Sequence, residues 1–192
     1  MESTVQWYQH CQEVASQKIS GITCALGGIG VVVHIDETFI KQKMNRSKGE
    51  ANDVWVLGLY DTNLRKGLVE RIPNRSADVL IPIIQRLVLP GTTIHTDEWE
   101  GYSQLSSLGY IHNKFKRSSE LVNPITGTHK NSIVGFLANL KRRITMESDS
   151  EDDVMCNSLD EFLYRHWFDM SVTTPMRNWD LFLQHIRDVY PV

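Results

Sequence analysis

Three short runs rich in β-branched and aromatic residues follow one another early in the chain, and they constrain its fold more than any other feature. IGVVVHID (29–36), DVWVLGLY (53–60) and KGLVERIP (66–73) each have the length and composition of a strand. The tripeptide DTN (61–63) is typical of a turn and joins the second run to the third. We therefore expect a sheet that begins as a three-stranded antiparallel meander.

After the meander, helical and strand patterns alternate. The remaining elements are helices at 76–89, 98–108 and 131–144, strands at 92–96 and 110–115, and further helices at 3–19, 158–168 and 176–190. A meander followed by alternating helices and strands predicts an α/β fold with a mixed sheet covered by helices. The expected fold is thus a five-stranded mixed sheet flanked by helices, with extra N- and C-terminal helices.

Two aspartates stand where predicted strands end. Asp36 ends the first strand and Asp97 directly follows the fourth. Ligands of such sheets lie near strand ends, so we expect the first and fourth strands to be adjacent and parallel. Their carboxylates should then lie on the order of 4–6 Å apart, close enough to share one cation. Mg²⁺ or Mn²⁺ prefers such oxygen ligands, and two ions could support phosphodiester chemistry. Turn residues or salt-bridge partners would give the same spacing, so both interpretations stay open.

The formal charge of −3 is unevenly distributed. Five acids lie in ESDSEDD (147–153), and without them the charge becomes +2. Basic residues cluster at 41–48, 114–117 and 141–143. A solvated face or loop explains any one cluster. Three clusters around a candidate acidic site favour nucleic acid as a partner.

Cysteine usage and hydropathy limit the compartment. The three cysteines lack C-x-x-C spacing, which argues for a reducing compartment and against a disulfide framework or zinc finger. The apolar stretch around 24–35 is too short and glycine-rich to span a bilayer. We expect an intracellular soluble protein, nuclear in a eukaryote and otherwise cytoplasmic, with no membrane partner and no small-molecule cofactor. The histidines show no metal-binding spacing, so hydrogen bonding in the core or loops is the expected role.

Several longer motifs resemble a known family. VVHIDETFIKQKMNR, DEWEGY and NPITGTHKN resemble the DDE transposase domain of the Merlin superfamily and its bacterial insertion-sequence relatives. The resemblance runs from about residue 3 to the end of the chain. It implies a ribonuclease-H-like fold, and DNA cleavage and strand transfer that depend on Mg²⁺ or Mn²⁺.

The resemblance also assigns site residues. Asp36 matches the first catalytic aspartate and Asp97 the second, but the position of the third acid holds Val134. Valine has no ligand atom, so the site is expected to be degenerate and catalysis impaired. Asn131, one helical turn upstream, could offer a substitute carbonyl oxygen.

Glu37 and Glu98 follow the two aspartates directly, so we expect them to point away from the site. DNA phosphates are expected to contact four basic residues: Lys41, Lys43, Arg46 and Lys141. Such binding is weak and independent of sequence. A homodimer is a further expected form.

The expected domain organisation has four parts. They are an N-terminal helix and linker ending a DNA-recognition region (1–28), the ribonuclease-H-like DDE core (29–146), an acidic loop (147–157), and C-terminal helices that pack on the core (158–192). The favoured function is a transposase-derived DNA-binding domain, domesticated or decayed. The alternatives are an active transposase with a substitute ligand such as Asn131, and a protein-interaction scaffold.

Overall fold

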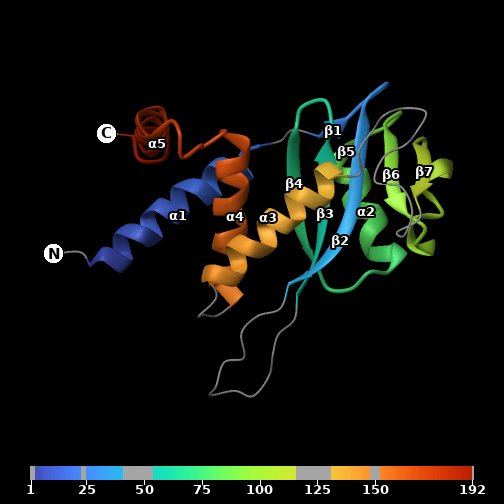
Figure 1. The fold of residues 1–192 in the computed structure, drawn as a ribbon, viewed down its shortest axis with the longest axis horizontal. Coiled ribbons are helices and arrows are strands. Elements are labelled where there is room, and N and C mark those ends of the chain that lie inside the picture. The colour runs from blue at the N-terminus through green and yellow to red at the C-terminus, as the bar shows by residue number, and fades with distance from the viewer. Residues whose placement is uncertain (1–2, 23–24, 41–53, 116–130, 148–151, 192) are drawn as a thin grey trace, which may run out of the picture. The chain divides into compact units, whose positions relative to one another are not determined.

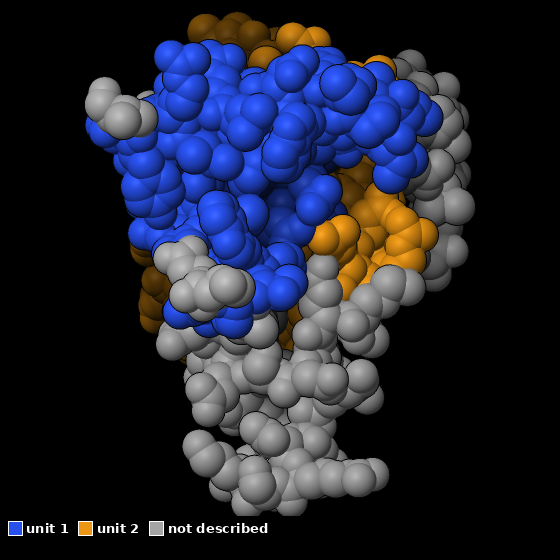
Figure 2. Space-filling view, turned by 90° about the vertical axis from the view of Figure 1, so that its left-hand side faces the viewer, with its two compact units in different colours: residues 1–23, 146–192 blue, residues 24–145 orange. Residues whose placement is uncertain are grey.

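The computed structural model describes residues 3–22, 25–40, 54–115, 131–147 and 152–191. The chain divides into two compact units, one of residues 24–145 and one of residues 1–23 with 146–192. They are coloured separately in Figure 2. Each unit is described by itself below.

The unit of residues 24–145 is built on a five-stranded mixed sheet. Its strand order is β4–β3–β2–β6–β7. The bounds are β2 (Val32–Ile40), β3 (Val54–Asp61), β4 (Lys66–Ile72), β6 (Thr93–Asp97) and β7 (Ile111–Phe115). The first three strands form the predicted antiparallel meander, and β2, β6 and β7 run parallel. Both the meander and the pairing of the first strand with the fourth are confirmed.

Helices lie on both faces of this sheet, as Figure 1 shows for α2 (Ala77–Leu87) and α3 (Asn131–Glu147). The strands supply the core through fully buried aliphatic side chains such as Val56, Leu59 and Ile94. Apolar residues on both faces are typical of strands with a helical layer on each side. The predicted α/β fold class is therefore confirmed.

Glycines in two strands let α3 approach the sheet closely. A Cβ atom at Gly58 would lie 2.6 Å from Leu137, and one at Gly67 would lie 2.5 Å from the Phe136 ring. Gly58 pairs with Asp36 across β3 and β2. Directly paired residues project from the same face of an antiparallel pair, so Asp36 lies on the face that α3 covers.

Two connections differ from the sequence-based expectation. The helix expected at 98–108 is instead two 3₁₀-helices, η1 (Glu100–Tyr102) and η2 (Leu105–Leu108). The side chain of Asp97 accepts a hydrogen bond from the Trp99 N–H at 3.1 Å, and such local bonds compete with an α-helix. In addition, the short strands β1 (Leu26–Gly27) and β5 (Val88–Leu89) form a separate parallel pair.

The other unit contains three helices among its described residues: α1 (Thr4–Ser20), α4 (Asp152–Trp167) and α5 (Pro175–Val189). Ser3 and Gln6 form a capping box that starts α1. Contacts within the unit include the Tyr8 hydroxyl donating to Glu161 at 2.9 Å. They also include an ion pair between Lys18 and Asp188 at 2.6 Å.

The expectation of an acidic loop over residues 147–157 is wrong, because helices occupy both ends of this segment. Helix α3 extends to Glu147 and α4 already begins at Asp152, while residues 148–151 lie outside the described ranges. The start of α4 is acidic in sequence, and acidic residues are favourable in the first turn of a helix. In the described ranges, no helix combines the length and the apolar character needed to cross a membrane.

Candidate metal centre

Asp36 and Asp97 lie on adjacent parallel strands. The register pairs His34 of β2 with His95 of β6, and each aspartate follows two residues later. Asp97 ends β6 as expected, but the expectation that Asp36 ends its strand is wrong, because β2 continues to Ile40. Asp36 is half-buried and Asp97 is buried. The sequence H-x-D therefore occurs on two neighbouring strands and brings both aspartates to one region of the sheet.

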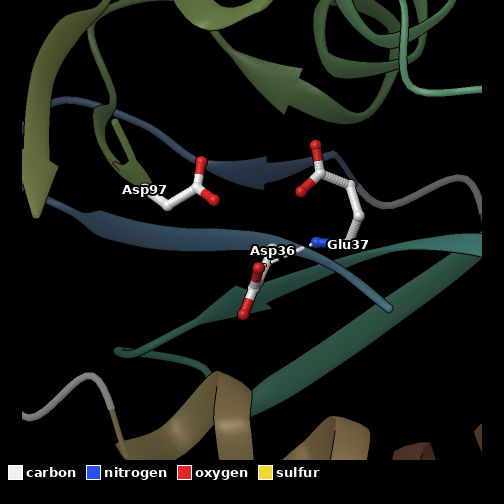
Figure 3. Close-up of side chains that lie close together, drawn as sticks. All are labelled: Asp36, Glu37 and Asp97. Carbon is white, nitrogen blue, oxygen red and sulfur yellow. Dashed lines mark hydrogen bonds between the residues drawn. The ribbon is translucent and has the colours of Figure 1, made fainter. Parts of the chain in front are cut away.

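A third acid, Glu37, joins the two aspartates. One carboxylate oxygen each from Asp36, Glu37 and Asp97 lies within 4.8 Å of the others, and Figure 3 shows the three side chains. The expected distance between Asp36 and Asp97 is thus confirmed. The expectation that Glu37 lies away from the site is wrong in part. Its side chain leaves β2 on the side opposite Asp36, as alternation requires, yet its carboxylate reaches the cluster.

Backbone N–H groups orient the two aspartates. The N–H of Glu37 donates to Asp36 Oδ1 at 3.0 Å, and the N–H of Trp99 donates to Asp97 Oδ1 at 3.1 Å. These two hydrogen bonds fix one oxygen of each carboxylate. A set of carboxylate oxygens fits a hard divalent cation such as Mg²⁺ or Mn²⁺ and suits soft metals poorly.

Glu37 is held by two protein donors. Its Oε1 accepts from the Tyr102 hydroxyl at 2.6 Å, and its Oε2 accepts from Arg75 at 3.3 Å. The Glu37 side chain is 0% exposed. Burial, together with the charge and hydrogen bond of Glu37, raises the pKa of Tyr102 well above its usual value, so Tyr102 stays a donor.

Arg75 connects Glu37 to two tryptophans. Its guanidinium carbon lies 5.0 Å from the ring centroid of Trp55 and 5.1 Å from that of Trp99. The Trp99 indole N–H donates to the Arg75 carbonyl at 3.2 Å. Two cation–π contacts and a charged hydrogen bond fix the orientation of this arginine.

Two stacked histidines lie on the Asp36 side of the sheet. The His34 and His95 rings are 5.2 Å apart and nearly parallel, and Phe115 contacts His95 at 4.7 Å. Burial, with a smaller effect of His112, lowers the pKa of His95 to about 4. The neutral ring pairs with Asn113 at 3.2 Å. His95 thus has the hydrogen-bonded core role that the sequence predicted.

The position assigned to the third acid lies on α3. Val134 is 44% exposed, beside Ile133, whose side chain would meet a Cβ atom at Gly58 at 3.3 Å. Helix α3 therefore packs on the face that carries Asp36. The Asn131 side chain is outside what the structure describes, so its role as a substitute ligand stays a prediction.

The structure describes only one of the four basic residues that are expected to contact DNA. Lys41, Lys43 and Arg46 fall in 41–53, outside the described residues. Lys141 is exposed on α3, and Lys114 is exposed on β7. The predicted phosphate contacts therefore remain predictions.

Comparison with known proteins decides the family. The family model of the ISXO2-like transposase domain matches residues 25–166, about three quarters of the chain. The chain belongs to this transposase domain family. With the strand order described above, this membership confirms the transposase and ribonuclease-H-like parts of the expectation. No match was found among curated proteins.

Solved structures with a similar course of the chain include viral integrases. The HTLV-2 integrase catalytic core domain in complex with magnesium is 13% identical, covers 80% of this chain and 93% of its own, and has a TM-score of 0.47. The BIV integrase catalytic core domain is 16% identical, covers 83% of this chain and 97% of its own, and has a TM-score of 0.48. Likenesses this distant imply nothing about the site of the transposase domain.

Proposed function

We propose that the chain is a transposase-derived DNA-binding domain with a degenerate divalent-metal site. The observation that supports this proposal best is the pair Asp36 and Asp97, with oxygens within 4.8 Å on adjacent parallel strands of a transposase domain. The Merlin-type assignment and a domesticated or decayed status belong to the same proposal.

In this proposal Asp36 and Asp97 would hold Mg²⁺ or Mn²⁺. The bound ion would lower the pKa of an attacking water and stabilise charge on phosphate oxygens. The protein's own contribution is orientation, because the N–H groups of Glu37 and Trp99 hold the two carboxylates. The stacked rings of His34 and His95 and the aliphatic core pack against that part of the sheet.

Val134 is the reason for proposing impaired catalysis. A carboxylate at this position would add a third negative ligand, and valine adds none. Losing one charged partner of a buried ionic site costs several kcal/mol. Because each 1.36 kcal/mol of barrier is about tenfold in rate, hydrolysis or strand transfer would be slower by orders of magnitude.

DNA contact is proposed for Lys41, Lys43, Arg46 and Lys141. Contacts of this kind go to phosphates, so affinity should fall steeply with salt and differ little between duplex sequences. Homodimer formation, an intracellular location and a DDE core over residues 29–146 complete the proposal.

Glu37 gives one specific reason to consider an active transposase. Its carboxylate lies within 4.8 Å of both aspartates and could be counted as the third acid in place of residue 134. That alternative predicts full activity with valine at position 134.

The test is the substitution Val134→Glu. The wild-type domain should bind Mn²⁺ only at about millimolar concentration or more weakly. Val134→Glu should bind Mn²⁺ more tightly and should nick DNA faster, as measured by electron paramagnetic resonance titration and by plasmid relaxation. The matched control is Asn139→Glu, which adds the same charge at an exposed position of α3 about 140° around the helix. The control should change neither measurement.

Equal cleavage by the wild-type domain and by Val134→Glu would contradict the degenerate site. The third ligand would then be Glu37, Asn131 or another oxygen. If neither protein bound Mn²⁺ at any concentration tested, the metal centre itself would be wrong.

A further inference from the structure

Glu37 is surrounded by protein donors on the side of β2 that faces away from α3. Its side chain is fully buried, and each of its carboxylate oxygens accepts one hydrogen bond, from Tyr102 or from Arg75. Tyr102 is itself 0% exposed. A buried carboxylate is stable only when such donors satisfy it, and here the fold supplies them.

One of these donors, Tyr102, comes from the segment that carries Asp97. Tyr102 lies in η1, five residues after Asp97, and Trp99 lies between them. Trp99 stacks on Arg75, donates its indole N–H to the Arg75 carbonyl, and donates its backbone N–H to Asp97 Oδ1. A chain of contacts therefore runs from Glu37 through Arg75 and Trp99 to the Asp97 carboxylate.

Gly101 shows how closely this segment is packed. A Cβ atom there would lie 2.7 Å from the Trp99 indole nitrogen and 3.5 Å from the Arg75 carbonyl oxygen. The indole therefore packs against the Gly101 backbone on one side, while Trp99 as a whole is 43% exposed. The position of Trp99, and with it the N–H that binds Asp97, is set by the network rather than by the local chain alone.

We infer that Glu37 is a positioning residue and not a metal ligand, and that the Glu37 network (Glu37, Arg75, Trp99 and Tyr102) holds the Asp97 carboxylate beside Asp36. For the metal this inference rests on the proposed function, since it concerns the same two aspartates. It assigns a role to the acid after the first aspartate and to the D-E-W-x-x-Y motif, of which only Asp97 serves as a ligand.

Charge and solvation favour this role over direct ligation. Arg75 is a cation 3.3 Å from Glu37, so a second cation on the same carboxylate would be repelled. Mg²⁺-type ions also keep several water ligands, and a carboxylate with no exposed surface leaves no room for them. Asp36 is half-buried and suits such an ion better.

The experiment compares Tyr102→Phe and Glu37→Gln with the wild-type chain. Each variant weakens the network at one end, and Tyr102→Phe keeps the Glu37 carboxylate. Removing a group that orients a metal ligand lowers metal affinity about tenfold or more, so both variants should bind Mn²⁺ about tenfold more weakly. Hydrogen exchange of the Trp99 amide, measured by NMR without metal, should become severalfold faster in both.

Tyr110→Phe is the matched control. It removes another buried phenol, whose hydroxyl donates to the Val88 carbonyl at 3.0 Å away from the network. If loss of stability alone caused the effects, Tyr110→Phe would produce them as well. We expect it to change neither Mn²⁺ affinity nor exchange of the Trp99 amide.

Three outcomes would overturn the inference. One is an effect of Glu37→Gln on Mn²⁺ binding with none of Tyr102→Phe, which would make Glu37 a ligand. Another is Trp99 exchange that stays at the wild-type rate in both variants. A third is an equal effect of Tyr110→Phe. If the wild-type chain binds no Mn²⁺, the proposed function fails separately, and exchange of the Trp99 amide alone decides whether the network positions Asp97.

Discussion

Two neighbouring acids on β2, Asp36 and Glu37, have opposite surroundings. Glu37 is fully buried and bonded to a tyrosine and an arginine, whereas Asp36 is half-buried on the face that α3 covers and accepts a backbone N–H. A carboxylate satisfied by side-chain donors contributes to folding. A partly exposed carboxylate beside Asp97 is suited to a cation. Adjacent residues of one type can thus have structural and chemical roles because a strand sends them to different faces.

The largest expected effect is a difference in the free energy of unfolding between substitutions of Glu37 and of Asp36. Glu37→Ala leaves Arg75 and the Tyr102 hydroxyl without their acceptor, which should lower the free energy of unfolding by roughly 3–5 kcal/mol. Asp36→Asn removes one of three clustered negative charges and keeps an acceptor oxygen, so it should change that free energy by less than about 1 kcal/mol. Urea denaturation measures both. Equal losses would mean that the two acids have the same role.

The next largest effect is the pH dependence of stability caused by His95, whose ring stacks on His34 on the Asp36 side of the sheet. The pKa of His95 is about 4 in the folded protein and about 6.5 in the unfolded chain. Between these values the unfolded chain binds a proton that the folded protein does not. The contribution of His95 to the free energy of unfolding is therefore fully present above pH 6.5. This free energy falls by roughly 3 kcal/mol as the pH drops to 4.

His95→Gln should remove most of that loss and keep a partner for Asn113. Urea denaturation at pH 7 and pH 4.5 gives the two free energies for each protein. Because burial and Lys114 lower the pKa of His112 as well, a smaller decrease should remain in the variant. An unchanged dependence on pH would show that His95 is not the buried neutral base.

The smallest effect tests whether α3 packs against the face of Asp36. Gly58→Ala would place a methyl group 2.6 Å from Leu137 and should destabilise the fold by about 1–3 kcal/mol. Gly135→Ala has no atom within 4 Å of the added carbon and should stabilise α3 by up to about 1 kcal/mol. Thermal unfolding of both variants gives the comparison. A harmless Gly58→Ala would place α3 further from the sheet.

Much of the fold could be predicted from local pattern. The β-branched runs and the DTN turn predicted the meander. The meeting of Asp36 and Asp97 was also predicted, although Asp36 lies inside β2 and not at its end. The helix expected at 98–108 was wrong because the Asp97 side chain competes for the backbone at Trp99. The sequence H-x-D occurs on two strands and could have predicted that His34 stacks on His95, but neither composition nor metal-ligand spacing indicates this contact.

The sequence by itself determined the succession of strands and helices, the two aspartates and the absence of an acid at residue 134, because hydrophobic periodicity and residue type are local properties. Only the tertiary structure decided the surroundings of Glu37. Its donors Arg75 and Tyr102 are 38 and 65 residues away along the chain, and no local pattern connects them. Alternation along β2 predicted that Glu37 points away from Asp36. The length of its side chain and its two donors, Tyr102 of η1 and Arg75, decided where its carboxylate lies.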